Sequence, residues 1–328
     1  MARIKFGVGI YGTNNGREAV ELARTAEELG YDRFWIGDSH MIWRELYVVA
    51  GAIAMATKRI AVGPGVTHPT VRHVTVTASA MATLHELTGG RVFCGFGVGA
   101  SGPGNIGMTP VSVEELAKNI DILKKLWRGD SVNIAGKEAH SLFPCGEIPI
   151  YIGTRAPQVM KLACRVADGI IHAGAIDGLE ELVRCIRGYA AEANRAPESV
   201  QFISRLPCAI DSDAAAAQEQ VKGVIARTAM TQLGRLYDRG ELADEHDCQA
   251  VERMRQEYDT YHHMDAAHNY LVRDQWVERF AIAGTAAHAR EQVRRIRAAG
   301  ADELTIIPCG TSKQATIETF AREVMEKL

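Results

Sequence analysis

Residues 60–97 read IAVGPGVTHPTVRHVTVTASAMATLHELTGGRVFCGFG and contain a complete strand–helix–strand unit. Residues 60–66 and 92–97 have the apolar, glycine-bounded character of buried strands, and residues 73–87 place apolar side chains at helical spacing. Two such strands joined by one helix predict parallel strands with a right-handed crossover. The unit is therefore the repeating element of an α/β fold.

The same alternation continues along the whole chain and predicts eight strands. Eight βα units favour a closed (β/α)₈ TIM barrel, with an open doubly wound sheet as the alternative. Residues 214–283 are long, helical and polar, and they predict a helical insertion between strands seven and eight, within a single domain spanning 1–328. The predicted strands are 4–10, 33–36, 60–66, 92–97, 148–152, 169–172, 200–210 and 303–307.

The composition is that of an ordinary soluble globular protein, with 47% hydrophobic and 23% charged residues and a net charge of −3. No basic stripe is present, which argues against nucleic acid as a partner. We expect no membrane segment, because no apolar run is long enough and the start, MARIKFGVGIYG, lacks a signal-peptide layout. The seven scattered cysteines favour reduced thiols in a cytoplasm over disulfides or a metal site.

The junction between the third strand and its helix, GPGVTHPTVRH at 63–73, is unusual. Gly63 and Gly65 permit backbone angles that other residues avoid, and Pro64 removes a hydrogen-bond donor from the ladder. The strand is therefore expected to leave regular β geometry between residues 63 and 67. His68 and Arg72 would then face a ligand, although a plain βα turn is the alternative reading.

Two further loops predict a phosphate site. GFGVGASGPGNIGM at 95–108 is rich in glycine, which lets backbone N–H groups approach an anion. GTRAPQ at 153–158 ends a strand and opens a helix, with Pro157 at the first helical position and Arg155 beside it. Neither loop is a Rossmann or P-loop motif, so the pair indicates a phosphorylated cofactor of another kind.

Several blocks resemble the bacterial luciferase-like, flavin-dependent superfamily, and most closely its methylenetetrahydromethanopterin reductase branch, which uses the deazaflavin F420. They cover nearly the whole chain outside 214–270. The blocks are FWIGDSHMIWRE, the stretch from GPGVTHPTVRH to GFGVG, PIYIGTRAP followed by ADGII, and FAIAGTAAHAREQVRRIRAAGADELTI.

The resemblance implies a TIM barrel that holds a flavin-type ring at its C-terminal mouth. It implies a bulge, with a non-prolyl cis peptide, at the exit of the third strand behind that ring. It also implies that the cofactor is bound by residues on four strand exits. These are Asp38 and Ser39, then Val66, Thr67 and His68, then Gly97, Val98, Gly99 and Ala100, and finally Gly153, Thr154, Arg155, Ala156 and Pro157.

The chain departs from the reductase pattern at two positions. Ala100 stands where the reductase often has an acid, and Tyr11 and Gly12 stand where it has another after the first strand. Acids near a pterin help to bind and protonate it, so the methanopterin substrate is not implied. The second strand ends in Asp38, Ser39 and His40 rather than the Asp-His pair of several F420 enzymes.

Asp38 and His40 are the predicted catalytic residues, since imidazole exchanges protons near neutral pH. Helix capping is the structural alternative for Asp38, and a salt bridge is the alternative for Arg72. A metal site at His263, Asp265 and His268 is disfavoured, because the spacing fits no standard zinc template. The predicted substrate-binding residues are Tyr11, Trp43, Arg72 and His263.

These observations predict an oxidoreductase that uses F420 to transfer hydride to or from a small organic substrate. An FMN-dependent monooxygenase is the alternative, and a cofactor-free binding protein and a metal-dependent barrel hydrolase are less well supported. A homodimer is expected from the family and from the apolar stretches 46–56 and 74–87.

Overall fold

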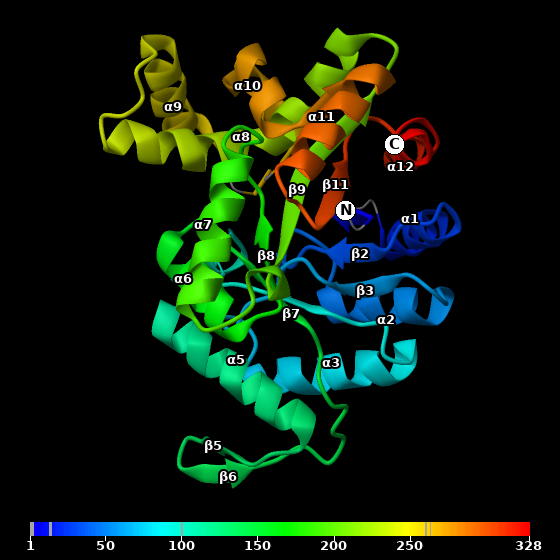
Figure 1. Ribbon diagram of the computed structural model, residues 1–328, viewed down its shortest axis with the longest axis vertical. Coiled ribbons are helices and arrows are strands. Elements are labelled where there is room, and N and C mark those ends of the chain that lie inside the picture. The colour runs from blue at the N-terminus through cyan, green and yellow to red at the C-terminus, as the bar shows by residue number, and fades with distance from the viewer. Residues whose placement is uncertain (1–2, 13–14, 100, 260, 263) are drawn as a thin grey trace. The chain divides into compact units, whose positions relative to one another are not determined.

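The computed structural model describes residues 3–12, 15–99, 101–259, 261–262 and 264–328 (Figure 1). All eight predicted strands are present. They pair in the order β3-β2-β1-β11-β9-β8-β7-β4, and the pairs β1–β2, β2–β3, β4–β7 and β7–β8 are parallel. These strands are β1 (Lys5–Ile10), β2 (Arg33–Ile36), β3 (Ala61–Pro64), β4 (Cys94–Phe96), β7 (Ile150–Gly153), β8 (Gly169–His172), β9 (Gln201–Ile210) and β11 (Glu303–Pro308).

Single parallel bridges between Val62 and Val92 and between Thr67 and Phe96 connect the β3 segment to the β4 segment. They join the two ends of the strand order, so the predicted (β/α)₈ TIM-barrel class is confirmed.

Helices follow nearly every strand, as the βα alternation predicts. In Figure 1, α1, α2, α3, α5 and α6 pack in succession along the strands, each against its neighbour in the chain. The helices are α1 (Gly16–Glu28), α2 (Leu46–Ala56), α3 (Val74–Thr88), α4 (Ser101–Gly104), α5 (Val113–Arg128), α6 (Pro157–Val166), α7 (Leu179–Glu192), α8 (Ala214–Asp238), α9 (Glu245–Glu257), α10 (Asp274–Phe280), α11 (Ala286–Ala298) and α12 (Lys313–Glu323).

Three short strands are not predicted by the sequence patterns. β5 (Val132–Ile134) and β6 (Lys137–Ala139) form an antiparallel hairpin whose turn residues Ala135 and Gly136 have positive φ. β10 (Ile282–Gly284) pairs with β9, so the helical stretch expected to reach residue 283 ends before it. Each of these strands is only three residues long, which is too short for an alternating pattern to stand out.

Contacts divide the chain into two compact units. Residues 7–172 and 184–203 form the first unit, and residues 1–6, 173–183 and 204–328 form the second. Each has its own apolar core. In the first unit, Trp35, Phe93, Tyr151, Ile171 and Ile203 pack together as side chains from five strand segments.

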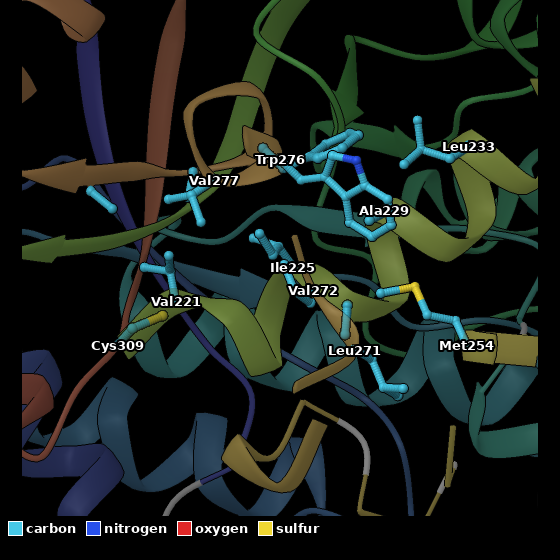
Figure 2. Close-up of a cluster of buried hydrophobic side chains, with 14 of the residues drawn as sticks. Val221, Ile225, Ala229, Leu233, Met254, Leu271, Val272, Trp276, Val277 and Cys309 are labelled. Carbon is cyan, nitrogen blue, oxygen red and sulfur yellow. The ribbon is translucent and has the colours of Figure 1, made fainter. Parts of the chain in front are cut away.

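The core of the second unit forms along α8. Val221, Ile225, Ala229 and Leu233 recur every four residues, so they share one face of the helix (Figure 2). Trp276 from α10 packs on the same cluster. The predicted insertion is thus a helical layer with its own buried face. None of the helices in the described ranges is both long and apolar enough to cross a membrane.

Candidate active site

The exit of β3 is irregular, as the Gly-Pro-Gly sequence predicts. Gly63 allows close approach to the β4 segment, because a Cβ there would lie 2.0 Å from the Phe93 carbonyl oxygen. The strand ends at Pro64, so the chain leaves regular β geometry where the sequence predicts it, and the peptide bond between Gly65 and Val66 is cis, as expected. The chain then rejoins β4, since the Thr67 N–H donates to the Gly95 carbonyl at 2.9 Å.

Val66 occupies space that three glycines leave open. A Cβ at Gly95, Gly97 or Gly153 would lie 3.0 to 3.2 Å from a γ-carbon of Val66. The same Cβ at Gly97 would lie 3.6 Å from the Gly153 carbonyl oxygen, so the two predicted phosphate loops begin side by side. At least some of the glycines in these loops therefore leave room for the Val66 side chain.

Asp38, at the exit of β2, is the centre of a buried hydrogen-bond network. Its Oδ2 accepts from Thr67 Oγ1 at 2.7 Å and from an Arg72 guanidinium nitrogen at 2.6 Å. The other Arg72 nitrogen donates to Glu45 Oε1 at 2.7 Å. Both terminal nitrogens of Arg72 are bonded to carboxylates, as in the salt-bridge alternative, and its contact with substrate stays a prediction. Asp38 caps none of the described helices.

Glu45 and Tyr47 are members of this network that the sequence patterns did not identify. Glu45 Oε2 caps α2 by accepting from the Val48 N–H at 2.8 Å. The Arg72 guanidinium carbon lies 5.3 Å from the centre of the Tyr47 ring, within cation–π range. Burial raises the pKa of Tyr47 above its ordinary value, so its hydroxyl stays protonated. An acid directly before an uncharged helix was the available signal for Glu45.

His68 lies beside Asp38 and is 3% exposed. Both of its ring nitrogens are buried without a hydrogen-bond partner among the described residues. Burial lowers the pKa of His68; Asp38 acts against this shift, whereas Arg72 and His40 add to it. Gly99, with φ +77°, passes so close that a Cβ there would lie 2.8 Å from the His68 ring. His68 is therefore a neutral ring with two unmade hydrogen bonds next to a carboxylate.

Tyr11 and Trp43 form an aromatic pair at the exits of β1 and β2. Their ring centres are 5.0 Å apart. A Cβ at Gly37 would lie 2.7 Å from Tyr11 and 2.8 Å from Trp43, so both rings rest on the backbone there. The Ser39 carbonyl accepts from the Trp43 N–H at 2.9 Å, and this bond closes the turn from Ser39 to Trp43.

His40 is half-buried in that turn, and its Nδ1 has no hydrogen-bond partner in the described part of the chain. Gly102 of α4 lies beside it, since a Cβ there would be 3.4 Å from the same nitrogen. The two predicted catalytic residues, Asp38 and His40, are thus separated by one residue in the chain. Asp38 is held in a hydrogen-bond network, whereas His40 Nδ1 has no hydrogen-bond partner among the described residues.

The second predicted phosphate loop leads into α6. Thr154 Oγ1 accepts from the Ala156 N–H at 3.0 Å, and no side chain caps the helix, which begins at Pro157. His172, at the end of β8, was not assigned a role from sequence. Burial lowers its pKa to about 4, and Arg155 acts in the same direction. The positive end of α6 and the guanidinium of Arg155 together favour an anion here.

The remaining predicted residues are placed as follows. Val98 is half-buried, and its carbonyl accepts from the Val111 N–H at 3.0 Å. Ala100 and His263 lie outside the described residues. His268 Nε2 accepts from the Asp259 N–H, and Asp265 caps a 3₁₀ turn. No cluster of possible metal ligands occurs among the residues that the structure describes.

Comparison with known proteins agrees with this fold. A family described as luciferase-like monooxygenase matches residues 1–303. The 5,10-methylenetetrahydromethanopterin reductase of Archaeoglobus fulgidus is 26% identical, over 99% of this chain and 100% of that protein. The F420-dependent glucose-6-phosphate dehydrogenase of Amycolatopsis mediterranei is 26% identical, over 95% of this chain and 94% of that protein.

A solved structure shares the fold over almost its full length. The coenzyme F420-dependent tetrahydromethanopterin reductase from Methanopyrus kandleri superposes with a TM-score of 0.84 at 24% identity, covering 99% of both chains. The chain therefore belongs to the luciferase-like family, and the expected resemblance is confirmed. The prediction of an oxidoreductase enzyme is confirmed at the level of class.

Proposed function

We propose that the protein is an F420-dependent oxidoreductase that transfers hydride to or from a small organic substrate. The observation that carries this proposal is the match, over 95% of the chain, to a dehydrogenase whose name states F420 dependence. The A. fulgidus reductase, which matches 99% of the chain, supports the same reaction type. The substrates of these relatives are not transferred to this protein, since substrate choice depends on loops rather than on the fold.

The residues at the strand exits fit a deazaflavin. Asp38 has one carboxylate oxygen bonded to Thr67 and Arg72, whereas Oδ1 accepts no hydrogen bond from the described residues. His68 adds two buried ring nitrogens without partners. Buried polar groups are costly unless they are hydrogen-bonded, so both side chains are suited to polar atoms of a bound ring.

The phosphate of the cofactor would be bound where the loops after β4 and β7 begin together. Gly99 would offer its backbone N–H group, whereas those of Gly97 and Thr154 already donate to the carbonyls of Thr67 and Ile171. The uncapped start of α6 adds its positive end. Arg155 supplies a guanidinium near the same helix terminus. F420, when bound, would supply a ring carbon that accepts or gives up hydride.

The other side chains would orient the substrate and move its proton. Tyr11 and Trp43 form a wall of two packed rings, which suits a flat or apolar substrate face. His40 would exchange a proton with the substrate at its unbonded Nδ1. Asp38 would remain a fixed hydrogen-bond acceptor, because its Oδ2 is already held by two donors.

Titration of the purified protein with F420 and, separately, with FMN tests the proposal. We expect F420 to bind at least about tenfold more tightly than FMN, read from quenching of each cofactor's fluorescence. Tighter binding of FMN would instead support the monooxygenase alternative, which the description of the family favours. Binding of neither cofactor would refute both functions.

We also propose a homodimer that covers α2 and α3. α2 has no charged residue, yet Val48 and Met55 on its outer face are 72% and 71% exposed. Val76 on the adjacent α3 is 53% exposed. A helix that is apolar on all sides is normally buried, so a second copy would cover this face. Sedimentation should show a dimer for the protein and a monomer for Val48→Glu, and a monomeric parent protein would reject the proposal.

A further inference from the structure

Arg72 connects two carboxylates that belong to different parts of the active site. Its side chain is 14% exposed and donates from separate guanidinium nitrogens to Asp38, at 2.6 Å, and to Glu45, at 2.7 Å. A guanidinium is rigid and planar, so fixing both nitrogens fixes the orientation of the whole group. Arg72 is therefore a link between the exit of β2 and the start of α2.

The Glu45 end of this link is anchored to backbone. Glu45 Oε1 accepts from Arg72, and Oε2 accepts from the Val48 N–H in the first turn of α2. The carboxylate thus cannot rotate freely without giving up the helix cap. Since α2 is a rigid element, the position of its first turn defines the position of the guanidinium.

The Asp38 end presents a single free oxygen. Arg72 and Thr67 both donate to Oδ2, and the described residues leave Oδ1 without a donor. We propose that Arg72 is a positioning residue, which orients Asp38 so that Oδ1 faces the bound cofactor, and that Glu45 acts on the cofactor only through Arg72. This inference rests on the proposed function in one respect, namely that Asp38 contacts the cofactor.

The charges of the three side chains support this role. Asp38 and Glu45 carry two negative charges against one positive charge on Arg72. Replacement of Arg72 by methionine would leave two carboxylates without their shared donor, and Asp38 could turn away from the cofactor. Lysine would keep the charge, but a compact ammonium group cannot reproduce the two-armed geometry.

A set of five variants tests the link. Arg72→Met removes it, Arg72→Lys keeps its charge, Glu45→Gln weakens its outer end, and Arg72→Met/Glu45→Gln tests coupling. Arg91→Met is the matched control, because Arg91 is also partly buried but donates to the backbone carbonyls of Ile60 and Thr57. Each variant is titrated with F420 and FMN, and its thermal unfolding is recorded.

We expect Arg72→Met to weaken binding of the preferred cofactor at least about tenfold, and Arg72→Lys and Glu45→Gln by about threefold each. The double variant should bind like Arg72→Met alone, since Glu45 has no other route to the cofactor. Arg91→Met should unfold at lower temperature with unchanged affinity. A folded Arg72→Met with parental affinity would overturn the inference, as would equal loss in Arg91→Met. If Arg72→Met does not fold, the lysine and glutamine variants decide in the same way.

Amide hydrogen exchange separates this inference from the proposed function. In the cofactor-free protein, Arg72→Met should speed exchange in the first turn of α2, where the Val48 N–H is bonded to Glu45. Unchanged exchange would overturn the link whatever the cofactor is. Faster exchange in a protein that binds neither F420 nor FMN would refute the proposed function and retain the link between Arg72 and α2.

Discussion

Two buried aspartates, one in each unit, are each held by an arginine, but their surroundings differ. In the second unit, Asp247 Oδ1 accepts from Arg273, from Gln275 at 3.0 Å and from the indole of Trp276 at 2.8 Å. All three donors come from the residues that begin α10. This network joins α9 to α10, and its donors belong to one short stretch of chain.

In the first unit, the donors to Asp38 come from separate segments, and unmade hydrogen bonds lie next to them. His68 retains two buried ring nitrogens without partners among the described residues. An unsatisfied buried polar group costs about 1–3 kcal/mol. The contrast teaches that the Asp247 network is satisfied by donors from its own unit, whereas the Asp38 network has unmade hydrogen bonds beside it, where the proposed cofactor would bind.

The largest expected effect is on stability. Asp247→Ala should lower the free energy of unfolding by about 3 kcal/mol, because the buried Trp276 indole and Arg273 lose their shared acceptor. Urea unfolding followed by tryptophan fluorescence measures this. Asp238→Ala is the control, because its ion pair with Arg255 is exposed and should contribute at most about 1 kcal/mol. Equal stability of the two variants would contradict the claim that the buried Asp247 network stabilises the fold more than the exposed ion pair of Asp238.

The second expected effect is a dependence on pH. The folded state keeps His172 neutral down to about pH 4, whereas the unfolded chain takes up that proton near its ordinary value of 6.5. The unfolded state therefore binds more protons between these values, and stability should fall as the pH is lowered through them, by up to about 3 kcal/mol.

His172→Gln should lose less stability than the parent protein on acidification over this range. His262→Gln is the control, since Asp259 raises the pKa of His262 and that residue cannot cause the same acid loss. Unfolding curves at neutral pH and near pH 4.5 give the measurement. An equal loss of stability on acidification in the parent protein and in His172→Gln would show that His172 does not cause the pH dependence.

The third effect should fall on binding rather than on folding. Asp38→Asn keeps the size of the side chain but removes its charge, and we expect a loss of cofactor affinity of at least about tenfold, or 1.4 kcal/mol. Its stability should change less than that of Asp247→Ala, because Arg72 keeps Glu45 as a partner. A parental affinity in the folded variant would place Asp38 with Asp247 as a packing residue.

The smallest effect distinguishes two glycines of one loop. Gly99→Ala should cost about 1 kcal/mol, because φ is +77° and the new Cβ would meet His68. Gly104→Ala meets no atom within 4 Å and should stay within about 0.5 kcal/mol. The unfolding temperatures of the two variants give the measurement. An equal change in both would show that the close approach of Gly99 to His68 does not affect stability.

The fold could be predicted because its signals are local. Most of the predicted strands are apolar runs next to a glycine or proline, and the glycines and proline of residues 63–67 predict that the strand ends there. The hairpin of β5 and β6 could not be predicted, since strands of three residues carry no measurable period. β10 was missed for the same reason, at the edge of a long helical stretch.

The candidate site was predicted in part. Asp38, Thr67 and His68 directly follow strands and therefore converge at one end of a parallel sheet, and the family resemblance is what assigns them to the cofactor. The partners of Arg72 depend on how α2 and α3 pack, which no spacing in the sequence encodes. Likewise, Gly97 and Gly153 were interpreted as phosphate loops, whereas their contact with Val66 depends on the path of the backbone after β3.

The close packing of glycines against Val66 constrains how this site can change during evolution or redesign. Gly97 and Gly153, on two neighbouring strand segments, leave room for the side chain of one valine from a third segment. An alanine at Gly97 or Gly153 would place its Cβ 3.1 or 3.0 Å from a Val66 γ-carbon, so Val66 would have to shift, whereas after Val66→Ala the remaining neighbours would lie at ordinary contact distances of 3.6 and 3.8 Å. Positions 66, 97 and 153 should therefore vary together among descendants of this sequence, and libraries that sample them jointly should yield more folded variants than libraries that sample them one at a time.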